Sequence, residues 1–361
     1  MTTVARFSVE FSQYLDPQGQ AHEPLPDFAR DPAVLLSLYR AMVLTRAFDN
    51  RAISLQRTGK LGTFASSLGQ EAVGVAVASA MLDGDVLLPY YRDHGAQLIR
   101  GVSMKESLLY WGGDERGSAF ANAARDFPNC VPIGTQIGHA TGVAYAMKLR
   151  RRPEAAVCLL GDGCTSKGDF YEGMNIAGAM KLPLLFVVSN NQWAISVPRH
   201  AQTAAETLAQ KAIAAGIEGV QVDGNDVIAV HDAARKALDK ARSGGGPTVI
   251  EALTYRLGDH TTADDATRYR DAEELKQRWQ IEPIARLRNY LVARGHWDKE
   301  REERLLQECA EQVGREVEAY LAAPPPPTEA MFDHTYAELP EALKEQREAA
   351  VQAAHEGATH G

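Results

Sequence analysis

Asp162 stands between two glycines in LLGDGCTSKGDFYEG, residues 159–173, directly after an apolar run that is typical of a buried strand. Such a turn can simply join a strand to a helix, because glycine accepts positive φ and aspartate bonds its own backbone. Glycines before a helix also expose backbone N–H groups that bind phosphate. However, Asp169 follows Gly168 where a P-loop has lysine, and Ser166 replaces the third glycine of the dinucleotide motif. The turn alone leaves both interpretations open.

A second pair of polar residues follows the next apolar run, LPLLFVVS, residues 182–189, which leads into NNQW. Residues 164–189 suffice for a helix, a turn and a returning parallel strand, and ligands gather beyond the carboxyl ends of parallel strands. Asp162 and Asn191 are therefore expected to meet over adjacent strand ends. A carboxylate and an amide oxygen suit Mg²⁺, which completes its octahedron with phosphate oxygens and water. These residues predict a phosphate ligand held through a metal ion.

Five segments in order resemble the α subunit of the thiamine-diphosphate-dependent decarboxylating component of 2-oxo acid dehydrogenase complexes. They are RTGKLGTFASSLGQEA, PYYRDHG, GDGCTSKGDFYEGMNIAGA, NNQWAIS and YRLGDHTTADDATRYR, and the resemblance covers about residues 36–340. It implies an α/β thiamine-diphosphate-binding fold, a parallel sheet with helices on both faces, and N-terminal and C-terminal helical extensions. It also implies thiamine diphosphate and Mg²⁺ as cofactors.

The resemblance assigns roles to residues of these motifs and of CVPIGTQIG, residues 130–138. Asp162, the side-chain oxygen of Asn191 and the carbonyl of Trp193 would bind Mg²⁺. His260, in the loop 257–270, would lie beside the diphosphate and the reacting carbonyl as the catalytic residue. The Gly, Asp and Thr content of that loop predicts mobility without cofactor. The cofactor-binding residues would be Tyr91, Arg92, Val131, Ile133, Gly161, Asp162, Gly163, Cys164, Asn191, Trp193 and His260.

Simpler interpretations exist for several of these residues when the resemblance is set aside. Arg92 is then a solvated residue at a strand exit, and His260 is a solvated loop residue. Tyr91 and Ile133 are then core residues, and Cys164 is a small packed hydrophobe.

The resemblance also implies partners and a substrate. The glutamate that activates the cofactor would come from a β subunit in an α₂β₂ heterotetramer, and the acyl group would pass to the lipoyl domain of a dihydrolipoyl acyltransferase core. Pyruvate is favoured over a branched-chain 2-oxo acid, because GDFYEGMNIAGA and DDATRYR resemble bacterial pyruvate subunits. Phe64, in GTFASS, is expected to line the substrate pocket, although it does not settle the size of that pocket. Thr261 and Thr262 occupy positions of phosphoserine in kinase-regulated relatives, but Asp271 departs from that pattern, so phosphorylation is not expected.

Two rival functions are weighed against this one. A single-chain enzyme of the transketolase or acetolactate synthase type would need its own activating glutamate and a further α/β domain. A non-enzymatic nucleotide-binding or scaffold protein would need neither the metal pair nor the His260 loop.

The composition of the chain excludes several classes of protein. The chain has 361 residues, 45% apolar and 24% charged, and its formal charge of −9 argues against a nucleic-acid partner. No apolar run approaches the roughly 20 residues that span a bilayer, so no membrane span is expected. The N-terminus lacks a secretory apolar core, and the four cysteines show no metal-binding spacing, which together favour the cytoplasm.

The elements that must position the motifs follow from periodicity and turn signals. Asp31 is a candidate N-cap for a long helix, and AAVCLL, residues 155–160, is a buried strand. Further strands are expected at 85–91, 182–189, 219–224 and 247–256, and helices at 70–81, 168–181, 202–215, 227–241, from 271 to about 321 and at 340–355. Residues 112–134 are read as a long loop. Three regions are expected, an N-terminal extension (1–30), the α/β domain (31–322), and a Pro-rich spacer with a C-terminal helix (323–361).

Overall fold

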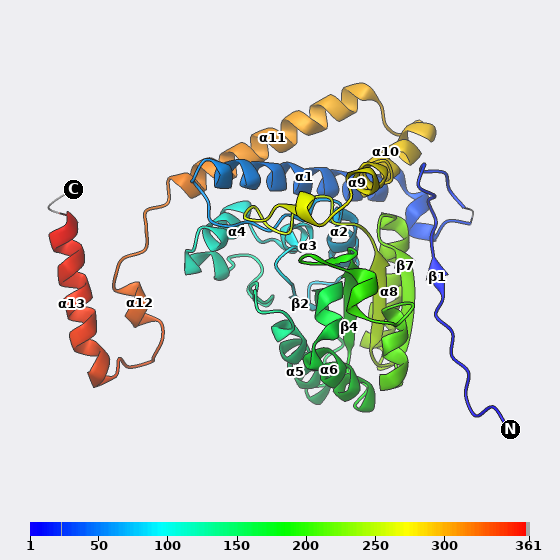
Figure 1. Ribbon diagram of the computed structural model, residues 1–361, viewed down its shortest axis with the longest axis horizontal. Helices are drawn as coiled ribbons and strands as arrows, with labels where there is room; N and C mark the ends of the chain where they lie inside the picture. The colour runs from blue at the N-terminus through cyan, green and yellow to red at the C-terminus, as the bar shows by residue number, and fades with distance from the viewer. Residues whose placement is uncertain (23, 359–361) are drawn as a thin grey trace. The chain divides into compact units, whose positions relative to one another are not determined.

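The computed structural model describes residues 1–22 and 24–358 (Figure 1). The chain forms two compact units, Met1–Glu318 and Ala319–Gly361. The first unit contains the sheet and all the motifs discussed above. The second contains the helices α12 (Ala330–Asp333) and α13 (Glu341–Ala358), within which Arg347 pairs with Asp333.

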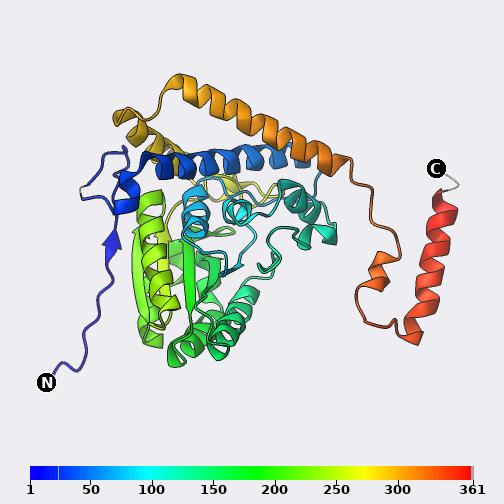
Figure 2. The same cartoon turned by 180° about the vertical axis from the view of Figure 1, so that it is seen from behind.

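A six-stranded parallel sheet organises the first unit, in the order β1-β7-β8-β4-β3-β2. Its strands are β1 (Phe11–Ser12), β2 (Val86–Leu88), β3 (Ala156–Gly161), β4 (Leu184–Asn190), β7 (Glu218–Asp223) and β8 (Thr248–Leu253). Leu160 of β3 lies opposite Val188 of β4, so the carboxyl ends of these two strands lie side by side. The N-terminal segment supplies β1, which pairs with β7 at the edge of the sheet (Figures 1 and 2). A short antiparallel pair, β5 (Trp193–Ala194) and β6 (Val197–Pro198), follows β4.

Alternate residues of each central strand enter two different cores, as a sheet covered on both faces requires. In β3, Val157 and Leu159 face one core, and Cys158 and Leu160 face the other. The first core is covered by α1 (Pro32–Arg57), α2 (Glu71–Ser79), α8 (Val227–Arg242), α10 (Pro283–Ala293) and α11 (Lys299–Leu321). The second is covered by α5 (Thr135–Leu149), α6 (Gly168–Ala179) and η4 (Ala209–Ala215).

The remaining elements of the first unit are short. They are η1 (Asp27–Arg30), α3 (His94–Arg100), α4 (Met104–Trp111), η2 (Glu115–Ser118), η3 (Asp162–Ser166), α7 (Arg199–Gln202), η5 (Ala266–Arg268) and α9 (Ala272–Trp279). No helix in the described ranges 1–22 and 24–358 combines the length and the apolar character needed to cross a membrane. All four cysteines are free.

Several predicted elements are confirmed. Asp31 caps α1 through a hydrogen bond from the backbone N–H of Ala33, and Pro32 is the first helical residue. The prediction of one helix over 202–215 is wrong, because α7 ends at Gln202 and η4 begins only at Ala209. The intervening segment is held by side-chain bonds instead, including Arg199 to the carbonyl oxygen of Ala205 at 2.7 Å.

Candidate functional site

A cavity of about 700 Å³ opens beyond the carboxyl ends of β3 and β4, and its size suits a small organic cofactor. A second cavity of about 810 Å³ shares only Trp193 with it. All eleven residues expected to bind cofactor line the 700 Å³ cavity: Tyr91, Arg92, Val131, Ile133, Gly161, Asp162, Gly163, Cys164, Asn191, Trp193 and His260. These residues come from five stretches that are far apart in the sequence, 91–92, 131–133, 161–164, 191–193 and 260, and they converge on one cavity.

Asp162 begins the turn at the end of β3 and is almost fully buried. Its Oδ2 accepts a hydrogen bond from Gln202 Nε2 at 2.7 Å, and burial raises the pKa of its carboxyl group. Asp162 forms no ion pair with any residue that the structure describes, and a divalent cation would supply a direct partner for this buried carboxylate. Gly163 is required beside it, because a Cβ atom there would lie 2.7 Å from the Cβ of Ala194.

Asn191 directly follows β4, and Trp193 is the first residue of β5. Asn191 Oδ1 accepts from the backbone N–H of Trp193 at 3.1 Å, and Asn191 Nδ2 donates to Gln70 Oε1 at 2.9 Å. Gln192 between them has φ of 74°, in the left-handed region that non-glycine residues rarely adopt. Such strain is typical of functional sites, where the surrounding structure holds it. The donor set around Asp162 and Asn191 consists of oxygen ligands and fits Mg²⁺.

Arg92 is buried, which excludes the interpretation as a solvated strand-exit residue. Its Nη1 donates to the carbonyl oxygen of Ser66 at 2.7 Å, and its Nη2 lies 2.9 Å from His260 Nδ1. Since a guanidinium has only donors, Nδ1 must be the acceptor, and the proton of the neutral imidazole sits on Nε2. Burial, Arg92 and Arg256 together lower the pKa of His260 to about 4. His260 is therefore a neutral N–H donor at neutral pH.

The loop 257–270 is anchored mainly by polar contacts. Arg270 Nη1 donates to the carbonyl oxygens of Arg256 and Gly258 at 2.7 and 2.9 Å. The backbone N–H of His260 donates to Asp264 Oδ2 at 2.8 Å. These bonds give the loop a defined conformation around His260. Its mobility in solution without cofactor remains a prediction.

Two hydrogen bonds join the same loop to the segment RTGKLGTFASS. The backbone N–H of Phe64 donates to Thr262 Oγ1, and the backbone N–H of Thr262 donates to the carbonyl oxygen of Phe64, both at 2.9 Å. The Phe64 side chain does not line the cavity, contrary to expectation. It is fully buried and stacks on His94 with ring centroids 5.0 Å apart, so Thr63 and Ala65 line the cavity instead.

The apolar part of the cavity wall is unusually exposed. Val131 and Ile133 are 51% and 39% exposed although they line the cavity, so Ile133 is not a core residue.

Cys164 is buried, and burial raises the pKa of its thiol to about 12, which agrees with a packed hydrophobe and not with a thiolate. Trp111 and Lys167 also line the cavity. Trp111 was missed because an aromatic residue on an apolar helix gives no signal that separates it from the core.

Comparison with known proteins connects this arrangement to a family. The family model described as dehydrogenase E1 component matches residues 39–329. The chain belongs to this family. It is similar to the "Pyruvate dehydrogenase E1 component subunit alpha" of Acholeplasma laidlawii, with 42% identity over 87% of this chain and 92% of the relative. The proteins of the same name from Staphylococcus epidermidis (strain RP62A) and Staphylococcus aureus (strain Mu50) are each 40% identical over 94% of this chain and 92% of their own.

Family membership confirms the predicted resemblance and the α/β thiamine-diphosphate-binding fold class. Enzymes of the dehydrogenase E1 component family depend on thiamine diphosphate, so the prediction of an enzyme is confirmed and the non-enzymatic alternative is excluded. The cavity residues fit this cofactor. They offer the buried Asp162 for a cation, a glycine turn at a strand end for phosphate oxygens, and exposed apolar residues for an aromatic ring.

Proposed function

We propose that this chain is the α subunit of the decarboxylating component of a pyruvate dehydrogenase complex and acts in the cytoplasm. With a β subunit, it would bind thiamine diphosphate and Mg²⁺, decarboxylate pyruvate, and pass the acetyl group to lipoyl-lysine of a dihydrolipoyl acyltransferase. The main support is the convergence of eleven expected cofactor-binding residues on one cavity. The names of the relatives support pyruvate over a branched-chain 2-oxo acid.

In this proposal, Asp162, Asn191 Oδ1 and the carbonyl of Trp193 hold Mg²⁺, which in turn holds the diphosphate. Arg92 contributes a fixed positive charge, since its guanidinium is buried and bonded to the carbonyl oxygen of Ser66. Bound thiamine diphosphate supplies a nucleophilic carbon and an electron sink for loss of carbon dioxide. The role of this chain is to bind, orient and enclose the reactants.

His260 would stabilise negative charge that develops on the carbonyl oxygen of the substrate. Its Nδ1 is held by Arg92, so Nε2–H is the free donor. With a pKa of about 4 the imidazole carries no charge at neutral pH, and it therefore donates a hydrogen bond without acting as a strong acid. An approaching anion would raise this pKa, because it favours the protonated imidazole. A bound diphosphate would thus increase the share of the protonated imidazolium form of His260.

Two observations support an obligate β partner. Asp162 is the sole carboxylate among the described residues that line the cavity, so an activating glutamate must come from elsewhere. Apolar residues are also exposed on α5 and α6, which pack together. The exposed fractions are 40% and 65% for Tyr145 and Leu149 of α5, 45% for Ile176 of α6, and 38% for Met180, which directly follows α6. A β subunit that covers this face and the cavity mouth would bury them, and two such pairs would form the α₂β₂ assembly.

The test combines the purified chain with and without a β subunit in the presence of thiamine diphosphate, Mg²⁺ and an artificial electron acceptor. Turnover is expected only for the assembled protein and should be faster with pyruvate than with 3-methyl-2-oxobutanoate. Asp162→Ala should abolish Mg²⁺-dependent cofactor binding in calorimetry without unfolding the chain. Full turnover by the isolated chain would contradict the partnership and favour a single-chain transketolase-like enzyme. A preference for the branched substrate would reassign the substrate.

A further inference from the structure

Gln70 is a buried polar residue next to the candidate metal site, at the turn before α2. Its Oε1 accepts two hydrogen bonds, from Asn191 Nδ2 at 2.9 Å and from the Tyr90 hydroxyl at 3.2 Å. Gln70 and Asn191 are separated by 121 residues in the chain. The side chain at the start of α2 therefore reaches the amide that follows β4.

The Asn191 amide is oriented from both of its ends. Its oxygen accepts from the backbone N–H of Trp193 at 3.1 Å, and its nitrogen donates to Gln70. An asparagine amide has a donor end and an acceptor end of nearly equal shape, and only the acceptor end can bind a cation. Gln70 offers Asn191 an acceptor, so the bond forms only when the Asn191 nitrogen points toward it. The oxygen is then left on the opposite side.

Gln70 itself has an unfavourable feature. Its Nε2 is buried and has no hydrogen-bond partner among the described residues. An unpaired buried N–H lowers stability, and an apolar side chain of similar size would avoid it. A glutamine at this position is explained if the Asn191 nitrogen and the Tyr90 hydroxyl require its amide oxygen as their acceptor. The unpaired nitrogen is then a cost that comes with the amide group.

The backbone beside Gln70 is held in place from two directions. Gly69 has φ of +90°, and a Cβ atom there would lie 2.4 Å from the carbonyl oxygen of Tyr255, so the turn is pressed against the chain that follows β8. The carbonyl oxygen of Gly69 accepts from Thr254 Oγ1 at 2.7 Å, and its N–H donates to Glu71 Oε2 at 3.0 Å. The backbone from which the Gln70 side chain projects is therefore held in place.

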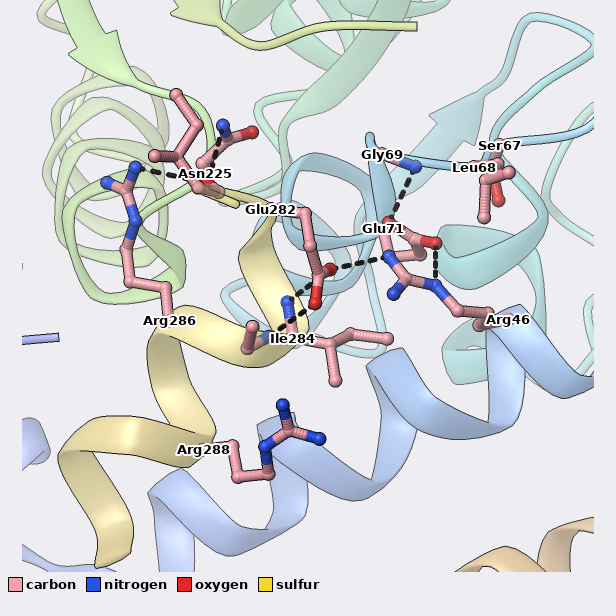
Figure 3. Close-up of polar contacts among 12 residues, drawn as sticks. Arg46, Ser67, Leu68, Gly69, Glu71, Asn225, Glu282, Ile284, Arg286 and Arg288 are labelled. Atoms are coloured by element: carbon pink, nitrogen blue, oxygen red, sulfur yellow. Dashed lines mark hydrogen bonds and ion pairs between the residues drawn. The ribbon is translucent and has the colours of Figure 1, made fainter. Parts of the chain in front are cut away.

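Glu71 is fixed in turn by a buried ion-pair network that joins three helices (Figure 3). Arg46 of α1 bonds Glu71 of α2 at 2.8 Å and Glu282 at 2.7 Å. Glu282 caps α10 by accepting from the backbone N–H groups of Ile284 and Ala285. The turn that carries Gln70 is therefore attached to α1, α2 and α10 and cannot shift independently of them.

We propose that Gln70 is a positioning residue of the metal site, whose amide oxygen holds the nitrogen of Asn191 so that the Asn191 oxygen is presented to Mg²⁺. Gln70 has this role only if Asn191 binds Mg²⁺, as the proposed function requires. The partners of metal ligands commonly affect affinity without touching the metal. Gln70→Leu leaves the Asn191 nitrogen without an acceptor, so the amide loses one of its two constraints. Gln70→Glu keeps an acceptor at the same place.

The experiment measures the affinity of the assembled α and β chains for Mn²⁺, by electron paramagnetic resonance, in the presence of thiamine diphosphate. Gln70→Leu is expected to weaken Mn²⁺ binding by about 10- to 100-fold, whereas Gln70→Glu should restore the wild-type affinity. Gln97→Leu on α3 is the matched control, because Gln97 is equally buried, at 4% exposure, and bonds no predicted ligand. The Mn²⁺ affinity of the Gln97→Leu variant should equal that of the wild type.

Gln70→Met also removes the acceptor and replaces Gln70→Leu if the leucine variant does not fold, as judged by circular dichroism. Wild-type affinity in either folded variant would overturn the positioning role. A loss in Gln70→Glu equal to that in Gln70→Leu would also overturn it, since the acceptor would then be irrelevant. Asp162→Ala separates this failure from failure of the proposed function, because unchanged Mn²⁺ binding in that variant would reject the metal site itself.

Discussion

Arg46→Met is expected to destabilise the protein far more than the loss of an ordinary ion pair. Arg46 is shared by two carboxylates, those of Glu71 and Glu282, whose side chains are 0% and 8% exposed (Figure 3). Methionine fills a similar volume but leaves both carboxylates buried without a cation. The substitution therefore tests whether a charge network supports the turn beside the cavity.

Removing one partner of a buried ion pair costs about 3–5 kcal/mol, because the remaining charge stays desolvated. The cost should depend on pH. Burial raises the pKa of Glu71 while Arg46 lowers it, so the variant raises that pKa further. A carboxyl group whose folded pKa is raised is protonated without penalty at low pH, and its contribution to stability is lost as pH rises through that pKa. The destabilisation should thus be smaller at about pH 5 than at about pH 8.

Urea denaturation of the full chain, followed by circular dichroism at both pH values, gives the free energies of unfolding. Arg304→Met is the control, because Arg304 pairs with Glu300 at 3.0 Å on the exposed surface of α11 and should cost no more than about 1 kcal/mol. Arg46→Met combined with Glu71→Gln should recover part of the loss at high pH. A loss for Arg46→Met no larger than the control, or one that is equal at both pH values, would refute the reasoning.

Of three further predictions, two concern the cavity and one concerns Asp49, a buried residue of α1. Gly163→Ala should weaken cofactor binding and cost about 1–3 kcal/mol by overpacking against Ala194, measured by calorimetry and denaturation, and an unchanged affinity would contradict it. Burial raises the pKa of Asp49 to about 7, so the wild type loses stability as the pH rises through this range, whereas Asp49→Asn does not. The variant should therefore gain up to about 1.4 kcal/mol per pH unit relative to the wild type between about pH 4 and 7. Equal pH dependence of the free energy of unfolding in the two proteins would contradict this prediction. His260→Ala should lower turnover and acyl transfer more than Mn²⁺ affinity. Thiamine diphosphate should also protect the loop 257–270 from proteolysis. Near-normal turnover of the variant, together with equal cleavage of the loop with and without cofactor, would show that His260 is only a solvated loop residue.

The sequence predicted the elements whose determinants are local. The uninterrupted apolar run AAVCLL predicts β3 as a buried strand, and Asp31 followed by Pro32 predicts the start of α1, because the cap needs only neighbouring backbone groups. The position of Asp162 at a strand end follows from the same local pattern. The segment 199–215 could not be predicted in this way, since its conformation depends on contacts such as that of Arg199 with the carbonyl oxygen of Ala205.

The order and content of five motifs predicted the family. The resemblance to that family then named eleven cofactor-binding residues, in these motifs and in CVPIGTQIG, and all eleven line the cavity. Only the tertiary structure decided how those residues are supported. The bond of Gln70 to Asn191 and that of Arg46 to Glu282 join residues separated by 121 and 236 positions, and no local pattern encodes such pairs. The inward direction of the Phe64 ring was decided by packing against His94, since alternation along a short irregular segment does not fix which face is buried.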